Sequence, residues 1–497
     1  MATDAIDPHD IPNVVDMYEE SDEYLIPDLD YSLSAPDDIP LFPPPLEHDD
    51  LLGCGQQIDY LNLPGLRTLF EPLKGKSRLL VRAEQLLPSN CPECGSGMDR
   101  FKGNGTRRQH LLDEPRGSLG VRIDLRRRSY SCRECGTSKL VPLGCLAEAR
   151  RMTRRLELYI QRRSLLRPFQ EVAHETGVSA KTVREIFREY VKALELEREA
   201  KCPMPRVLGL DGVYINSKER AILTDPERGL VIDILPTVQA ELLGAALRSM
   251  PGCERVEVVT IDMSAGLRSA VIRAFPNASI VIDRYHIQRM ANESVDRVRL
   301  RLRKEIKRTR GGVHMCHRKL VRKHRGQLTM DEQGQLERYF GLFPELRSAY
   351  ETKEAFFALW RATSSVAAKA LYEEWRVTCP PAIKTDFKAL LTAMENWGEY
   401  IFNYFDHPYT NAFTEASNRR IKDIQREGRG GSFPTVRAKV IFGTLLRQEL
   451  KAARKLEPGN TRRGTPRAKG LKPKEVEASV SVMSHHSLPV RLQLALF

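Results

Sequence analysis

The chain has 497 residues, and its 41% hydrophobic content is sufficient for globular domains. A length of this order suits about three domains. No run approaches about 18 apolar residues, which argues against a transmembrane helix. The N-terminus lacks a basic segment followed by an apolar one, which argues against a secretion signal. We therefore expect globular domains with no membrane partner.

Charge is distributed unevenly along the chain. The formal net charge is +13, but residues 1–50 contain fifteen of the 65 acidic residues and none of the 78 basic ones, which leaves +28 on the remainder. This excess of positive charge on residues 51–497 predicts a polyanionic partner, most simply nucleic acid. The acidic, proline-containing segment 1–50 is predicted to be mostly disordered. It could shield the basic surface, recruit a partner or only keep the chain soluble.

Two CxxC pairs, each followed by glycine, suggest a metal site. They lie in CPEC, at Cys91 and Cys94, and in CREC, at Cys132 and Cys135. Each pair can turn so that two thiolates face one ion, and four thiolates complete a structural Zn²⁺ site. Because 37 residues separate the pairs, we predict a zinc ribbon with a long internal hairpin. A redox pair is the alternative. Upstream, residues 51–85 are expected to form a short helix and then a strand.

The segment FQEVAHETGVSAKTVREIFREYV, residues 169–191, fits a helix-turn-helix. It has a small residue on the first helix, a glycine in the turn and an apolar anchor on the second helix, namely Ala173, Gly177 and Val183. Ser179 would cap the second helix. DNA contacts are expected from the start of that helix, at Lys181, Thr182 and Arg184. An ordinary helical hairpin is the alternative.

Residues 206–236 contain three apolar runs, which predict an antiparallel meander. The runs VEVVTID and ASIVID follow, separated by amphipathic SAGLRSAVIRAF, in a strand–helix–strand pattern. This order is that of an RNase H-like fold of the α/β class. Asp211 would lie mid-sheet on the first strand. Asp262 and Asp283 would lie at carboxyl ends of strands, where open α/β sheets bind ligands. For any one such Asp, helix capping is the alternative.

Residues 291–400 are rich in Arg and Lys, and we interpret them as an all-helical insertion with a basic face. Glu415 follows on a helix. Arg419 and Lys422 stand at i+4 and i+7 from it, on the same face, where they could meet backbone phosphates. Residues 451–497 are basic and contain Pro and Gly, so a flexible arm is expected.

Asp211, Asp262 and Glu415 can converge only in the folded chain. Such a trio suits two Mg²⁺ or Mn²⁺ ions about 3.5–4 Å apart, arranged for phosphodiester displacement. Hard divalent cations take oxygen ligands, so the residue types are appropriate. His286, three residues after Asp283, could hold the cluster by a hydrogen bond. Alternatively, it packs on the sheet at a helix start.

Together these residues resemble the transposases of the ISL-three family of bacterial insertion sequences, over about residues 61–446. The resemblance rests on the cysteine ribbon, the helix-turn-helix and the LGLDG, TIDMSAGLRSAV, PNASIVIDRYHI and NAFTEASNRRIK blocks. It implies a DDE transposase whose RNase H-like domain is interrupted by a helical insertion. By motif, the catalytic positions fall to Asp211, Asp262 and Glu415. Asp283 and His286 match the family's supporting Asp-x-x-His pair.

The predicted organisation has six parts. They are an acidic segment (1–50), a zinc-ribbon domain (51–146), a helix-turn-helix domain (147–200), a catalytic domain (201–290 and 401–450), a helical insertion (291–400) and a basic tail (451–497).

The resemblance implies binding of terminal inverted repeats, two-metal cleavage and strand transfer, with a homo-oligomer, a dimer, in the synaptic complex. It also implies a bacterial cytoplasmic, nucleoid-associated protein. Two alternatives stay open. One is a catalytically silent DNA-binding protein, such as a repressor or a decayed transposase. The other is a metal-dependent nuclease without strand transfer.

Overall fold

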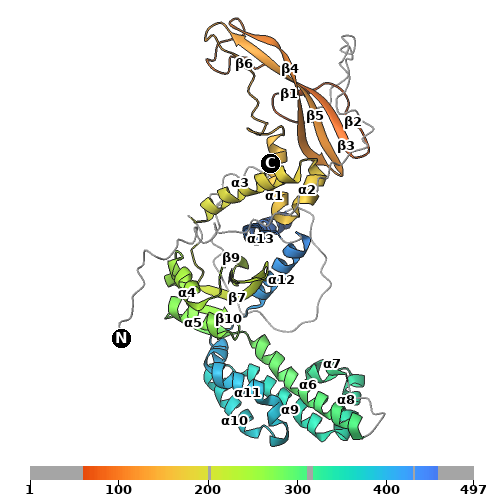
Figure 1. The fold of residues 1–497 in the computed structure, drawn as a ribbon, viewed down its shortest axis with the longest axis vertical. Coiled ribbons are helices and arrows are strands. Elements are labelled where there is room, and N and C mark those ends of the chain that lie inside the picture. The colour runs from red at the N-terminus through yellow and green to blue at the C-terminus, as the bar shows by residue number, and fades with distance from the viewer. Residues whose placement is uncertain (1–59, 200–202, 310–316, 429–430, 457–497) are drawn as a thin grey trace. The chain divides into compact units, whose positions relative to one another are not determined.

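The computed structural model describes residues 60–199, 203–309, 317–428 and 431–456 (Figure 1). They group into two compact units. One contains the described residues between 203 and 441, and the other contains residues 60–199 and 442–456. The acidic segment 1–50, and the basic tail beyond residue 456, lie outside the described residues.

The N-terminal unit begins with a six-stranded sheet of order β1-β3-β5-β4, in which β2 pairs with β3 and β6 with β5. The strands are β1 (Leu66–Thr68), β2 (Leu73–Lys74), β3 (Arg78–Gln85), β4 (Phe101–Arg116), β5 (Leu119–Cys132) and β6 (Ser138–Leu140). Antiparallel β4 and β5 form the long hairpin between the cysteine pairs, and β3 runs parallel to β5. Val121, Ile123 and Leu125, at alternate positions of β5, pack the core of one face.

The start of this unit differs from the sequence-based expectation. From residue 60 onward, short strands β1 and β2 stand where a helix was predicted within 51–85. Pro64 is followed by Gly65, whose φ of +77° no helix adopts, and Pro72 would interrupt a helix again. Residues 51–59 lie outside the described part of the chain.

Three helices complete the unit: α1 (Arg154–Leu166), α2 (Phe169–Thr176) and α3 (Ala180–Glu199). Gly177 ends α2 with φ of +71°, a conformation that glycine adopts without strain. Ser179 Oγ accepts the Thr182 N–H at 3.1 Å, so this serine caps α3 as the sequence predicts. Val183, fully buried, anchors α3 in a core shared with α1 and α2.

The larger unit is built on a five-stranded sheet of order β11-β10-β7-β8-β9. The strands are β7 (Val207–Ile215), β8 (Lys218–Asp225), β9 (Leu230–Leu235), β10 (Val258–Ile261) and β11 (Ser279–Ile282). The first three form the predicted antiparallel meander, and β10 runs parallel to both β7 and β11. Helices α4 (Ala240–Ser249) and α5 (Ala265–Ala274) lie on one face, and α12 (Ala412–Glu427) lies on the other (Figure 1).

Strand alternation decides which residues meet α12. Leu208 and Leu210 of β7 belong to the core that also contains residues of α4 and α5. The intervening positions therefore face α12. Thr260 pairs with Gly209 and with Val281. Two residues further along each strand, this register brings Asp211, Asp262 and Asp283 into one row on the α12 face.

Residues 284–402 are helical wherever the structure describes them, apart from short connections. The helices are α6 (Arg284–Thr309), α7 (Arg318–Arg322), α8 (Met330–Leu342), α9 (Pro344–Ala358), α10 (Ser365–Thr378) and α11 (Pro381–Phe402). Their apolar faces share one core with the α5 side of the sheet. None of the helices in the described ranges is long and apolar enough to cross a membrane.

The last helix, α13 (Phe433–Leu456), runs six residues beyond the expected domain boundary at 450. Its first half docks on the sheet, because Arg437 donates to both carboxylate oxygens of Asp233, at 2.7 and 3.0 Å, inside the core. The boundary between the two units falls after Ile441. Beyond it, a Cβ on Gly443 would meet the Leu165 carbonyl at 3.0 Å.

Gly209 allows α12 to approach β7 closely. A Cβ on this residue would lie within 3.0 Å of the hydroxyl oxygens of both Thr224 and Thr414. Those two buried hydroxyls share a hydrogen bond of 2.7 Å, which links β8 to α12. Any side chain at position 209 would push α12 away from the sheet.

We therefore predict that Gly209→Ala lowers the free energy of unfolding by about 1–3 kcal/mol, the usual cost of overpacking. Amide hydrogen exchange in α12 should become faster. Gly212→Ala is the matched control, since the added Cβ would meet only the end of the flexible Glu219 side chain. Equal exchange rates in the two variants would contradict the close approach.

Candidate functional site

Asp211, Asp262 and Glu415 come together at the carboxyl ends of the parallel strands. Asp211 lies within β7, Asp262 directly follows β10, and Glu415 lies in the first turn of α12. Burial, then the negative charges of Asp262 and Glu415, raise the pKa of Asp211 to about 6. The three carboxylates that the sequence singles out are thus electrostatic neighbours in the fold.

Two hydrogen bonds orient the Asp211 carboxylate. Its Oδ1 accepts the Gly212 N–H at 2.7 Å, and its Oδ2 accepts Nδ2 of Asn418 at 2.8 Å. Sequence reasoning missed Asn418. Asn418 lies three residues after Glu415, and residues at i and i+3 share a helix face. This spacing could have predicted that Asn418 lies beside the carboxylates.

Asp262 and Glu415 both lie beside His286. Burial raises the pKa of Asp262, and the neighbouring His286 opposes that rise. Asp262 Oδ1 is buried without a hydrogen-bond partner among the described residues. Glu415 lies beside His286 and Arg419, with Oε1 at 3.4 Å from His286 Nε2 and Oε2 at 3.8 Å from Arg419. His286 therefore stands beside the cluster, in the place considered for it from the sequence.

Asp283 occupies the same row but is fully engaged. Its Oδ1 accepts the N–H of Tyr285 at 2.9 Å, and its Oδ2 accepts the N–H of Asn411 at 3.0 Å. Asn411 is the N-cap residue of α12. Asp283 thereby ties the start of α6 to the start of the helix that carries Glu415. Sequence reasoning did not single out Asn411.

The chemistry of this cluster fits divalent cations. Its donors are carboxylate oxygens, which Mg²⁺ and Mn²⁺ prefer, and one of them is a buried oxygen without a partner. Among the described residues, the carboxylate oxygens do not all lie within 4.8 Å of one another.

The four cysteines of the ribbon converge, with all four sulfur atoms within 4.8 Å of one another. Cys91 Sγ lies 3.8 Å from Cys135 Sγ, and Cys94 Sγ lies 3.7 Å from Cys132 Sγ. Zn–S bonds of about 2.3 Å in a tetrahedron place the sulfur atoms about 3.8 Å apart. The cluster could therefore bind zinc, and these separations exceed the length of a disulfide bond.

The two knuckles repeat the same backbone geometry. Cys91 N donates to Ser96 O at 2.8 Å, and Cys132 N donates to Thr137 O at 2.9 Å. Glycines with φ of +78° and +67° make the two turns possible. A hydrogen bond with the Ser96 hydroxyl lowers the pKa of Cys94 to about 6, whereas burial raises the pKa of Cys91 to about 11. A bound metal ion would favour the thiolate form of both.

The expected DNA-contacting residues lie at or near the surface. Lys181 and Arg184 are exposed on α3, and Thr182 is half-buried beside the Ser179 cap. On α12, Lys422 is exposed, and 79% of the Arg419 side chain is accessible.

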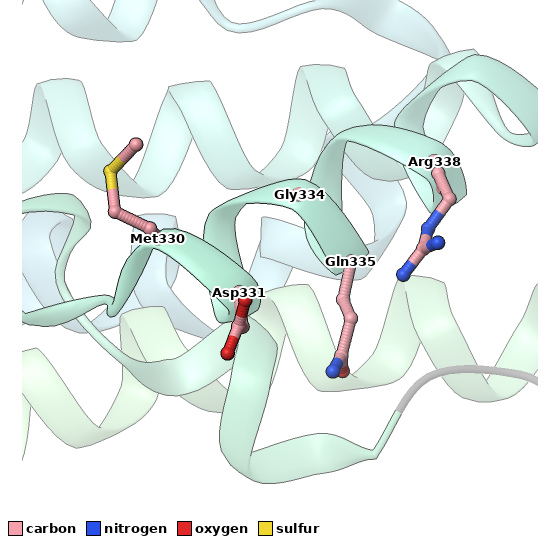
Figure 2. Close-up of a pocket in the computed structure, with 5 residues that line it drawn as sticks. All are labelled: Met330, Asp331, Gly334, Gln335 and Arg338. Carbon is pink, nitrogen blue, oxygen red and sulfur yellow. The ribbon is translucent and has the colours of Figure 1, made fainter.

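A separate cavity of about 430 Å³ lies along α8 (Figure 2). It is lined by Met330, Asp331, Gly334, Gln335 and Arg338. None of the residues singled out from the sequence contributes to it.

Comparisons with known proteins agree with these features. A family model described as "Transposase" matches residues 208–439, and one described as "Helix-turn-helix domain of transposase family ISL3" matches residues 146–191. The transposase for insertion sequence element IS1001 of Bordetella parapertussis is 23% identical over 385 residues, which cover 76% of this chain and 91% of that relative. The matched ranges contain the carboxylates and the first part of α3 respectively, but neither contains the cysteine cluster.

For the cysteine cluster, we predict about one zinc per chain by metal analysis of the purified protein. Cys132→Ser should lose the metal and unfold the N-terminal sheet, because binding energy at a structural zinc site is also folding energy. Cys145→Ser, which alters a free thiol outside the cluster, should keep both metal and fold. Full zinc retention in Cys132→Ser would contradict the assignment.

Proposed function

Because this chain belongs to the transposase family ISL3 and is a DNA transposase, we propose how it acts. It binds the terminal inverted repeats of an insertion sequence and catalyses phosphodiester cleavage and strand transfer. The observation that best supports this proposal is the meeting of Asp211, Asp262 and Glu415 on one face of the sheet. Clustered carboxylates beside exposed cationic side chains suit the handling of a phosphodiester.

The catalytic domain is proposed to be RNase H-like. Three features support this: the antiparallel meander, the parallel β7, β10 and β11, and the first carboxylate within β7. The helices between β11 and α12 then correspond to an insertion, since α12 returns to the sheet after them.

Asp211, Asp262 and Glu415 are proposed to hold two Mg²⁺ or Mn²⁺ ions. The chemistry supplied by two such ions is activation of a water or 3′-hydroxyl and stabilisation of the leaving oxygen in an in-line displacement. Burial raises the pKa values of Asp211 and Asp262, and the charges of Asp262 and Glu415 add to the rise at Asp211; these shifts support the assignment, because a bound cation favours the ionised carboxylates.

The surrounding residues have positioning roles in this proposal. Asn418 and the Gly212 amide fix the Asp211 carboxylate. His286 steadies Glu415, and Asp283 holds the start of α12 through Asn411. Arg419 and Lys422 continue along α12 from Glu415, where they can contact phosphates of the bound strand.

Recognition of the element ends is assigned to the helix-turn-helix, with Lys181, Thr182 and Arg184 of α3 toward the DNA. The two ends of one element must be brought together before strand transfer. We therefore propose a homo-oligomer, a dimer, in the synaptic complex.

Single substitutions at the three carboxylates test the catalytic proposal. Asp211→Asn, Asp262→Asn and Glu415→Gln should each abolish cleavage of supercoiled donor DNA in Mg²⁺ and leave binding to the ends intact. Asp283→Asn and the loss of His286 should reduce activity less. Glu241→Gln, which changes an exposed carboxylate on α4, is the control and should cleave normally.

Other outcomes separate the alternatives. Normal cleavage by Asp262→Asn and none by Asp283→Asn would assign the second catalytic position to Asp283. Cleavage by the wild-type protein without joining to target DNA would indicate a nuclease. End binding without cleavage in Mg²⁺ or Mn²⁺ would indicate a silent DNA-binding protein.

Substitutions on α3 test end recognition. Lys181→Ala and Arg184→Ala in the full-length protein should each weaken binding to end DNA by about 1–3 kcal/mol if they contact base edges. In both variants the preference for end DNA, measured as the ratio of the affinity for end duplexes to the affinity for random duplexes, should also fall. Lys192→Ala, an exposed lysine in the C-terminal half of the same helix, should keep that preference. An unchanged preference in both test variants would place specificity elsewhere.

A further inference from the structure

A line of charged side chains crosses one face of the six-stranded sheet. In the strand register Arg67 is opposite Glu84, Glu84 is opposite Arg126, and Arg126 is opposite Arg108. These four residues, which we name the arginine row, run across β1, β3, β5 and β4. Because adjacent strands are about 4.8 Å apart, the row is about 14 Å wide.

In the arginine row, Arg67 and Glu84 are paired with opposite charges, whereas, among the described residues, Arg108 and Arg126 are not. Glu84 forms ion pairs with Arg67 and, at 3.0 Å, with Arg128. Burial opposes ionisation of Glu84, but these two arginines outweigh it and lower its pKa. Arg108 and Arg126 have no ion pair in the part of the chain that the structure describes. Like charges directly opposite each other destabilise a sheet, so this pair is suited to an external anion.

The row is accessible to a large ligand. Arg108 is exposed, Arg126 is half-buried, and 52% of the Arg67 side chain is accessible. The alternate positions of β5, including Ile123 and Leu125, point to the opposite face and pack the core. Strand alternation therefore leaves the arginine row on the face away from that core.

The same sheet is joined to the helix-turn-helix. Leu112 of β4 packs into the core formed by α1, α2 and α3, and it forms a bridge with Met152. Leu112 and Arg108 are four residues apart on β4, so their side chains lie on the same face of the sheet. The arginine row and α3 therefore belong to one compact unit, in which Leu112 joins the sheet that carries the row to the core of the helix-turn-helix.

We propose that the arginine row binds the phosphate backbone of duplex DNA next to the site engaged by the helix-turn-helix. This inference rests on the proposed binding of element ends. Guanidinium groups match phosphate oxygens in a two-pronged geometry. Contacts to phosphates carry no sequence information directly, so the row increases affinity for every duplex and does not select the ends.

The test uses the full-length protein and the double variant Arg108→Gln/Arg126→Gln. The dissociation constant is measured for an end duplex and a random duplex at several salt concentrations. Loss of two phosphate contacts should reduce the slope of log affinity against log salt by about 1.8. Affinity should fall by the same factor for both duplexes. Arg108→Lys/Arg126→Lys should restore most of the salt slope, because phosphate contact needs the positive charge.

The charge-matched control is Lys102→Gln/Arg107→Gln. Both residues are exposed on β4, and their partners Ser131 and Arg127 stand at the alternate positions of β5, so they belong to the other face. This control should keep the wild-type salt slope. Zinc content and melting temperature, measured for every variant, verify that the sheet is folded.

Three results would overturn the inference while the proposed function stands. They are an unchanged slope and affinity in the row variant, an equal loss in the control, and stronger DNA binding by the row variant. The last result would assign the row to an acidic partner, such as residues 1–50 of this chain. Failure of the wild-type protein to bind any duplex would overturn both this inference and the proposed function.

Discussion

The close approach of α12 to β7 at Gly209 is the constraint on which the candidate active site depends. Glu415 and Asn418 reach Asp211 because no side chain separates the helix from the strand. The Thr224–Thr414 hydrogen bond fixes the depth of this approach, and the bond from the Asn411 N–H to Asp283 fixes the start of the helix. A carboxylate that lies more than 200 residues after Asp211 in the chain thus becomes its neighbour.

Bringing three carboxylates together is unfavourable by itself. Burial first, and then the charges of Asp262 and Glu415, raise the pKa of Asp211 from 3.8 to about 6, which corresponds to about 3 kcal/mol for ionising this group in the fold. The position of Glu415 in the first turn of α12 offsets part of the repulsion, because a helix N-terminus favours negative charge. Favourable packing elsewhere in the fold compensates for the remaining unfavourable free energy, and a bound cation would lower that free energy.

The sequence predicted the sheet of this site better than its helices. Alternating apolar runs that end in Asp are local features, so the order of the strands and the positions of Asp211 and Asp262 followed from them. The roles of Asn411 and Asn418 depend on how α12 sits on the sheet, which no local pattern encodes. The helix expected within 51–85 was wrong from residue 60 onward, since Gly65 and two prolines override an apolar pattern.

Asp262 and Asp283 were equivalent by pattern, because each directly follows a buried parallel strand. The fold distinguishes them by the donors each one meets. Asp283 accepts two backbone amides, which satisfy its oxygens and bind it to the ends of two helices. Asp262 keeps a buried oxygen without such a donor and is within electrostatic reach of Asp211. Both oxygens of Asp283 are occupied by amides, whereas Asp262 keeps one oxygen that could receive a cation, and this difference supports the proposed assignment of the second catalytic position to Asp262.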